Sequence, residues 1–180
     1  MSEPKRDKNS IRIPAATVLR SPVHLLAFWF GSGLSPKAPG TAGTVAAVPL
    51  WLLLQPLNLS LPAYLALLVV LFVCGCWICG ESARQLGVHD YGGIVFDEVV
   101  GLLITCIPLL PALGWVSDVG PGRWWWLLAA FALFRLFDVW KPWPIAWIDR
   151  RVGGGIGIMV DDVLAAVYAA LILAVATHYI

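Results

Sequence analysis

Charged residues are scarce in this sequence of 180 residues, and that scarcity argues against an ordinary soluble domain. Asp, Glu, Lys and Arg together make up 13% of the chain, about half the share in an average soluble domain. Apolar residues make up 59%, and the mean hydropathy is +0.81. This composition indicates an integral membrane protein. The ten tryptophans agree with it, because indole rings favour the headgroup level of a bilayer.

Several other features are missing. No apolar segment of signal-peptide type precedes position 23, so residues 1–21 are expected to form a retained cytoplasmic tail. The net charge is only +1, which gives no reason to expect a nucleic-acid partner, and no obligatory protein partner is evident. No internal repeat divides the chain. Its length suits one domain, which we expect over residues 22–180.

The cysteines are few and lie in apolar runs, three of them in the stretch CGCWICG. A C-x-C-x-x-C spacing could hold a metal ion through thiolates, but no His or second Cys pair lies nearby in the sequence. We therefore interpret the four cysteines as small, polarisable residues that pack between helices.

Five apolar segments are candidates for membrane-embedded helices, since a span needs about 20 mostly apolar residues. They are residues 41–57, 61–80, 98–113, 122–138 and 161–179. The first and third are the weakest, because both are short and contain proline. A further stretch, HLLAFWF, is too short to span and is expected to lie in the interface or to re-enter. The sequence thus predicts an all-α, polytopic membrane bundle with four or five membrane-embedded helices.

Charge is distributed unevenly between the two sides of such a bundle. With five spans, eleven of the twelve Lys and Arg residues fall on the side of residues 1–40, 81–97 and 139–160, the exception being Arg123. The positive-inside rule places this side, and the N-terminus, in the cytoplasm. Ten of the eleven carboxylates lie on the same side, the exception being Asp118.

Five of these carboxylates mark the ends of predicted spans. Asp97 and Glu98 stand where one span begins, Asp161 and Asp162 where another begins, and Asp138 where the span between them ends. Helix capping explains a single acidic residue at a helix start, but two adjacent pairs and a fifth carboxylate exceed what capping requires. The alternative is a site for a hard cation. Mg²⁺ binds a few carboxylate oxygens together with water and phosphate oxygens.

Basic residues are interleaved with this acidic group in FRLFDVWKPWPIAWIDRR. Asp138 and Lys141 are three residues apart and share a helix face if the helix continues to Pro142. The segment is also typical of an interfacial anchor, and such an anchor can present Lys and Arg to a lipid phosphate. The glycines of VGGGIGIMVDD follow it. They allow either close approach of backbone amides to a ligand or a flexible turn.

The loop SPKAPGTAGT precedes the first predicted span. Lys37 supplies a positive charge, and Thr41 and Thr44 offer hydroxyl groups at the start of a helix. Helix N-termini bind anions through free N–H groups and the helix dipole. The loop is therefore predicted to form one wall of a phosphate site, and a simple Pro/Gly turn is the alternative.

Three segments, GSGLSPKAPGTAGT, HDYGGIVFDEVVG and FRLFDVWKPWPIAWIDRRVGGGIGIMVDDVLA, closely resemble the phosphatidylglycerophosphatase A family. The resemblance runs from about residue 22 to the C-terminus. It implies a Mg²⁺-dependent phosphoric monoester hydrolase of the bacterial inner membrane, multi-pass, with its active site at the cytoplasmic end. Such an enzyme converts phosphatidylglycerophosphate to phosphatidylglycerol and inorganic phosphate in glycerophospholipid biosynthesis. One departure is Gly93, where many members of the family carry Glu.

The resemblance also implies roles for the residues that match its motifs. Catalytic positions are Lys37, Asp97, Asp138, Lys141, Asp149 and Arg150. Phosphate contacts are expected from Lys37, Lys141 and Arg150, with the hydroxyls of Thr41 and Thr44. One or two Mg²⁺ ions are expected on Asp97, Glu98, Asp161 and Asp162. Attack by a metal-activated water and direct attack by an aspartate both stay open.

Two other classes of protein compete with this interpretation. A small ion or metabolite transporter would use carboxylates near the middle of its spans, whereas nearly all ionisable residues here stand at one predicted face. A purely structural membrane subunit would not need two adjacent acidic pairs. Motifs of other phosphatases, D-x-D-x-[TV] and C-x5-R, are absent from the sequence.

Overall fold

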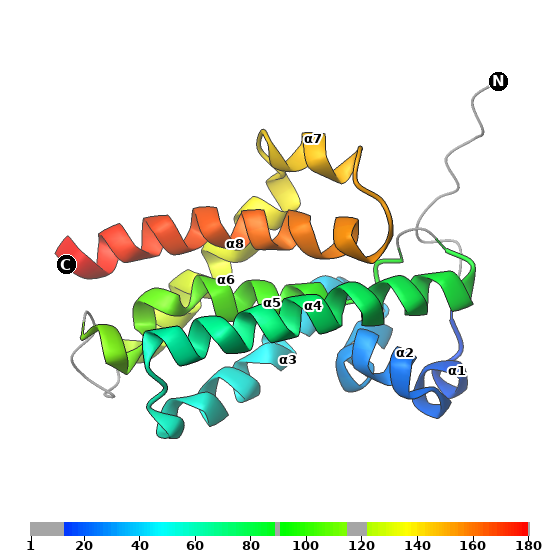
Figure 1. Cartoon of the computed structure of the whole chain (residues 1–180), viewed down its shortest axis with the longest axis horizontal. Helices are drawn as coiled ribbons and strands as arrows, with labels where there is room; N and C mark the ends of the chain where they lie inside the picture. The colour runs from blue at the N-terminus through cyan, green and yellow to red at the C-terminus, as the bar shows by residue number, and fades with distance from the viewer. Residues whose placement is uncertain (1–12, 89–90, 115–121, 180) are drawn as a thin grey trace.

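The computed structural model describes residues 13–88, 91–114 and 122–179, and all regular secondary structure in these ranges is helical. The prediction of an all-α fold is confirmed for this part of the chain. Long helices run roughly side by side, and a short helix, α5, lies among them (Figure 1). The elements are α1 (Ala15–Arg20), α2 (Pro22–Ala27), η1 (Trp29–Leu34), α3 (Pro39–Leu54), η2 (Gln55–Leu57), α4 (Leu61–Leu86), α5 (Phe96–Thr105), η3 (Ile107–Leu109), η4 (Pro111–Leu113), α6 (Gly122–Trp140), α7 (Ile145–Asp149) and α8 (Gly154–Tyr179).

Among the residues that the structure describes, three helical segments are long and apolar enough to cross a membrane: Pro39–Leu57, Leu61–Leu86 and Gly154–Tyr179. Their outer faces are apolar and open to the surroundings. Leu65, Val69 and Trp77 on α4 and Val175 on α8 are all at least 43% exposed. Apolar side chains exposed along a long helix are expected where the surroundings are lipid rather than water.

The predicted span over residues 98–113 is wrong as a single helix. Helix α5 has 10 residues, about 15 Å at 1.5 Å per residue, and two 3-10 turns follow it. Pro108 and Pro111 stand in these turns, and proline cannot donate the backbone hydrogen bond that a continuing α-helix requires. The stretch HLLAFWF becomes part of α2 and η1, and η1 contains a break where Phe30 and Gly31 have positive φ.

Helix α5 forms the centre of the core. Seven of its ten residues are buried, and Val99, Leu102 and Leu103 are at most 1% exposed. Its residue Gly101 packs against the ring of Phe134 on α6, where a Cβ would lie 2.5 Å from the ring. The site described below is built around the first turn of this buried helix.

Helix α8 begins earlier than the sequence predicted. Its first residue is Gly154, so Asp161 and Asp162 lie two turns inside the helix rather than at its start. Gly155 allows α8 to touch α4, because a Cβ there would lie 1.7 Å from the carbonyl oxygen of Cys76. Most of the glycine-rich stretch is therefore helical, and at Gly155 the lack of a side chain serves helix packing rather than a flexible turn.

Candidate active site

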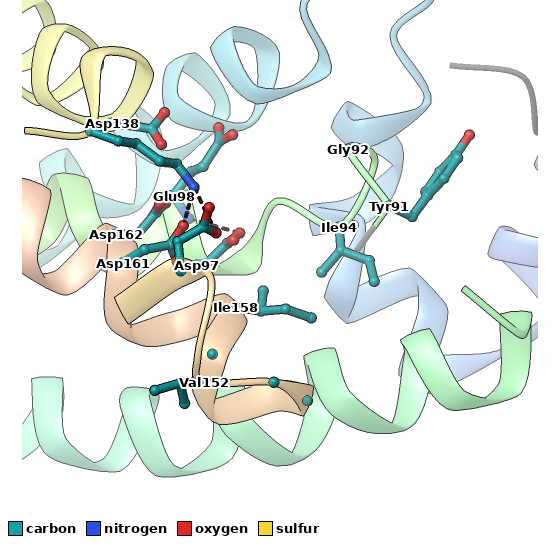
Figure 2. A pocket seen from close by; sticks show the side chains of 15 residues that line it. Tyr91, Gly92, Ile94, Asp97, Glu98, Asp138, Val152, Ile158, Asp161 and Asp162 are labelled. Carbon is teal, nitrogen blue, oxygen red and sulfur yellow. Dashed lines mark hydrogen bonds and ion pairs between the residues drawn. The ribbon is translucent and has the colours of Figure 1, made fainter. Parts of the chain in front are cut away.

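The helix ends that carry acidic residues meet at one end of the bundle. The first turn of α5 supplies Asp97 and Glu98, the end of α6 supplies Asp138, and the first half of α8 supplies Asp161 and Asp162. These five carboxylates line one pocket (Figure 2). Asp149, Lys141 and the backbone around the α8 glycines complete its polar wall.

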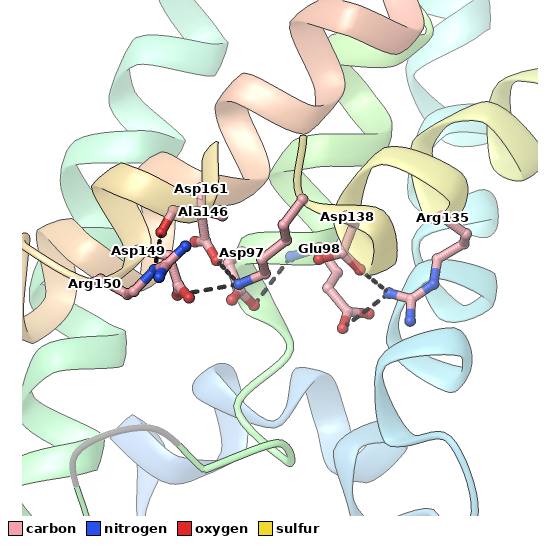
Figure 3. A network of polar contacts seen from close by, with 9 residues as sticks. Asp97, Glu98, Arg135, Asp138, Ala146, Asp149, Arg150 and Asp161 are labelled. Atoms are coloured by element: carbon pink, nitrogen blue, oxygen red, sulfur yellow. Dashed lines mark hydrogen bonds and ion pairs between the residues drawn. The ribbon is translucent and has the colours of Figure 1, made fainter. Parts of the chain in front are cut away.

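Lys141 is the basic residue that lines this pocket. Its Nζ donates to Asp161 Oδ2 at 2.5 Å and to Asp149 Oδ1 at 3.1 Å (Figure 3). Burial lowers the pKa of Lys141, but the carboxylates of Asp161 and Asp149 outweigh burial, and the net direction is upward. Lys141 therefore keeps its charge near neutral pH and holds α7 and α8 together.

The helix does not continue to Pro142, so Asp138 and Lys141 do not share the helix face that its continuation would have given them. Helix α6 ends at Trp140, and Lys141 adopts a left-handed backbone conformation with φ of 45°. This reversal directs the lysine toward Asp149 and Asp161 instead.

Arg135 is the second cation of the site, and the sequence interpretation did not assign it a role. Its Nη1 lies 2.6 Å from Asp138 Oδ2 and 3.2 Å from Glu98 Oε1. Glu98 Oε2 also accepts a hydrogen bond of 3.1 Å from Thr44 Oγ1. Arg135 thus links α6 to α5, and Thr44 links α3 to the same carboxylate. The spacing of Arg135 and Asp138, three residues apart on one helix, is a signal that could have found it.

Two carboxylates lie between these cation-paired groups without an ion pair of their own within the described residues. They are Asp97, whose Oδ1 accepts from the backbone N–H of Glu98 at 3.0 Å, and Asp162, which is 3% exposed. Asp162 Oδ2 and Asp161 Oδ1 are buried oxygens with no hydrogen-bond partner. Unpaired buried carboxylate oxygens are costly, so this part of the pocket is where an additional cation would be most stabilised.

The donor chemistry of the pocket fits a hard cation such as Mg²⁺, which takes carboxylate oxygens and keeps several waters. In the ranges that the structure describes, no group of three or more His, Cys, Asp and Glu side chains is already arranged to enclose a metal ion. Some carboxylate oxygens are already paired with cations of the chain, since Lys141 pairs with Asp161 and Arg135 pairs with Asp138. A bound ion would use the free oxygens of Asp161 and Asp162 with those of the α5 pair.

The loop SPKAPGTAGT reaches the site through its glycines. A Cβ at Gly40 would lie 2.0 Å from Glu98 Oε1, and one at Gly43 would lie 3.1 Å from Glu98 Oε2. Thr44 is buried, and its hydroxyl lies at hydrogen-bond distance from both the Gly40 carbonyl and Glu98. The loop and the start of α3 therefore pack directly on a carboxylate of the pocket.

Of the five residues predicted for phosphate binding, only Lys141 lines the acidic pocket, and Lys37, Thr41, Thr44 and Arg150 do not. Lys37 is exposed, and its side chain has no hydrogen bond or ion pair with any other residue that the structure describes. Arg150 is also exposed, and its Nε donates to the carbonyl of Ala146 at 2.8 Å. It lines a separate hollow on α7. Thr41, at the start of α3, is half-buried. The roles assigned to these residues stay predictions.

Gly93 has a packing explanation in this chain. A Cβ there would lie 2.6 Å from the ring of Tyr91 and 2.8 Å from the carbonyl oxygen of Gly33. A glutamate at this position would not fit without movement of the backbone of η1.

The fold and pocket define a helical protein with three helices fit to cross a membrane and a carboxylate-lined site at one end of its bundle. A family model described as Phosphatidylglycerophosphatase A matches residues 25–177, and the chain belongs to this family.

Curated relatives agree with the family match. A protein of Escherichia coli named Phosphatidylglycerophosphatase A is 45% identical over 162 residues, covering 89% of this chain and 87% of the relative. One of Haemophilus influenzae with the same name is 44% identical over 155 residues, covering 86% and 88%. A relative from Bacteroides thetaiotaomicron, provisionally named a phosphatidylinositol-3-phosphatase, is 41% identical over 156 residues, covering 84% and 91%. No solved structure matches the chain.

Proposed function

We propose that this protein is a lipid phosphatase that hydrolyses the terminal phosphate monoester of phosphatidylglycerophosphate to phosphatidylglycerol and inorganic phosphate. The family and two relatives with this name support the proposal. The observation that carries it is the pocket at the end of the bundle, which is lined by six carboxylates and Lys141. The comparisons give no support to a transporter, and the carboxylates gather at one end of the helices rather than at their middle.

The proposed location is the bacterial inner membrane, with the acidic pocket on the cytoplasmic face. Four or five helical segments would be membrane-embedded, namely α3, α4, α6 and α8 with the shorter α5 between them. Eleven of the twelve Lys and Arg residues lie on the same predicted side of the membrane as the pocket residues. This distribution supports the proposed orientation through the positive-inside rule.

The proposed cofactor is Mg²⁺, held by Asp97, Glu98, Asp161 and Asp162. A phosphate monoester carries a charge of about −1.5 to −2 at neutral pH, and six carboxylates surrounding one lysine would repel it. A bound divalent cation neutralises the phosphate oxygens and lowers the pKa of water. The unpartnered oxygens of Asp161 and Asp162 support this assignment.

The side chains of the site would bind the phosphate, hold the carboxylates in position and transfer the proton. Lys141, fixed by Asp149 and Asp161, presents its ammonium group to the phosphate. Arg135 holds Glu98 and Asp138 in place. The attacking water forms a bond to phosphorus opposite the lipid oxygen, whose bond to phosphorus breaks. A pocket carboxylate would accept the proton of the water and pass it to the departing lipid oxygen, which leaves as the alcohol.

The direct test is release of inorganic phosphate from phosphatidylglycerophosphate by the purified full chain in detergent. We expect release with Mg²⁺, loss of release with excess chelator, and recovery when Mg²⁺ is restored. Phosphatidylinositol 3-phosphate serves as the second substrate, because one relative carries that name. Absence of phosphate release from phosphatidylglycerophosphate by a folded, Mg²⁺-supplied protein would refute the proposal.

A further inference from the structure

A second hollow, with a mainly apolar surface and two basic side chains, lies at α7. It is lined by Trp143, Ala146, Trp147, Arg150 and Arg151, and the two hollows share no lining residue. The acidic pocket is lined mainly by carboxylates, whereas this one has two arginines and no carboxylate.

Both arginines are held in place by the protein without being neutralised. Arg150 Nε donates to the Ala146 carbonyl at 2.8 Å, and the Arg151 guanidinium lies over the Trp147 ring, 4.1 Å from its centroid. Neither forms an ion pair with a carboxylate of the described residues. Asp149, which precedes Arg150 in the sequence, accepts from Lys141 and belongs to the acidic pocket (Figure 3). The hollow is therefore a fixed pair of positive charges with free N–H donors.

The tryptophans beside the arginines determine the kind of partner. Trp143 is 79% exposed and Trp147 is 50% exposed, and Trp140 at the end of α6 is 67% exposed. Indole rings with a charged neighbour at the end of a membrane helix suit the level of lipid headgroups. A soluble anion would make no use of these rings, whereas a lipid would place its phosphate on the arginines and its first methylene groups on the indoles.

We propose that the α7 hollow binds the phosphodiester of an anionic membrane phospholipid, as a site separate from the catalytic pocket. The lipid would hold α7 at the membrane surface, and α7 carries Asp149, the partner of Lys141. The site thus couples the anionic lipid content of the bilayer to the position of the catalytic lysine. This inference goes beyond the proposed function, because it requires only that the bundle end lies at a membrane surface.

The test is binding of phosphatidylglycerol, with phosphatidylcholine as the zwitterionic reference, to the full chain in neutral detergent. Native mass spectrometry counts the lipids retained at each concentration. Each arginine near an anionic lipid contributes about a fivefold factor. We therefore expect the affinity for phosphatidylglycerol to fall about 25-fold in R150Q/R151Q and about fivefold in R151Q, which keeps the Arg150–Ala146 bond. Arg20→Gln, an exposed arginine on α1, is the matched control and should bind as the unaltered chain does.

Three outcomes would overturn the proposal. Unchanged phosphatidylglycerol binding in both R151Q and R150Q/R151Q, with unchanged thermal unfolding, would show that the lipid does not bind in the α7 hollow. Loss of binding in Lys141→Gln but not in R151Q places the retained lipid in the acidic pocket. Displacement of phosphatidylglycerol by millimolar inorganic phosphate shows that the hollow binds a free anion and not a lipid. Failure of phosphate release from phosphatidylglycerophosphate would leave these binding results unaffected, so the two proposals can fail separately.

Discussion

Gly40 and Glu98 lie in direct contact across α3 and α5, so closely that a Cβ at position 40 would stand 2.0 Å from Glu98 Oε1. The same glycine supplies the carbonyl that Thr44 binds, and Thr44 binds Glu98 in turn. The start of α3 is thus shaped around one carboxylate of the acidic pocket.

Gly40→Ala tests this contact. The added methyl group must displace the Glu98 carboxylate and with it the contacts to Arg135 and Thr44. We expect unfolding free energy to fall by about 1–3 kcal/mol, as in other overpacked sites, and phosphate release to fall at least tenfold, because 1.4 kcal/mol at the site suffices for that. Val45→Ala, on the exposed face of the same helix, should retain activity. Full activity in Gly40→Ala would show that Glu98 can move without consequence.

Asp97→Asn and Asp161→Asn remove one charge each from the pocket at nearly constant size. If these carboxylates hold the divalent cation, Mg²⁺-dependent phosphate release should disappear in both variants while the folded protein is still recovered from membranes. Glu81→Gln is the matched control, because Glu81 pairs with Arg84 on α4 and does not line the pocket. Substantial activity in both aspartate variants would argue against a ligand role for them.

Lys37→Ala tests the proposed phosphate contact of the loop before α3. Loss of a charge-assisted contact of about 1.5–3 kcal/mol corresponds to a fall of roughly 10- to 150-fold in kcat/KM. Lys37→Arg should rescue only part of this loss, because a planar guanidinium does not replace a compact ammonium. Thermal unfolding in detergent should be unchanged, since the Lys37 side chain is exposed. Normal kinetics in Lys37→Ala would show that Lys37 does not bind the phosphate and that the loop contributes only by packing around Gly40.

The four cysteines should be dispensable for catalysis. All are free thiols, and none of them lines the acidic pocket; Cys79 and Cys106 are buried while Cys74 is exposed. Replacing all four by alanine should preserve Mg²⁺-dependent phosphate release, with a loss of about 1 kcal/mol of stability for each buried cysteine. Inactivity of a variant that still unfolds cooperatively would mean that a thiol takes part in the reaction.

The gathering of the carboxylates could be predicted from the sequence because it depends on helix order alone. Asp97, Asp138 and Asp161 stand near alternate ends of successive apolar segments, and antiparallel neighbours bring such ends together. The structure places all three in one pocket. An error of two turns in the start of α8 did not alter this result, because the acidic pair still lies in the half of the helix near that end.

The finer arrangement of the site depends on contacts that the sequence pattern does not encode. Lys141 reaches Asp149 and Asp161 because its backbone reverses after α6, whereas Arg150 donates to the Ala146 carbonyl and does not line the acidic pocket. The position of Arg135 between Glu98 and Asp138 depends on how α5 and α6 pack. These directions are set by tertiary structure, so adjacent residues such as Asp149 and Arg150 end up in different hollows.

The short length of α5 has a consequence for the order in which the protein can be assembled. At 10 residues it is too short to be stable alone in a bilayer, and the 3-10 turns after it carry backbone groups that lipid cannot satisfy. Its shelter includes α8, which is made after α5 on the ribosome and which also supplies Asp161 and Asp162. A nascent chain that has not yet released α8 therefore has neither a sheltered centre nor a complete pocket, and the pocket can form only once α8 has joined the bundle.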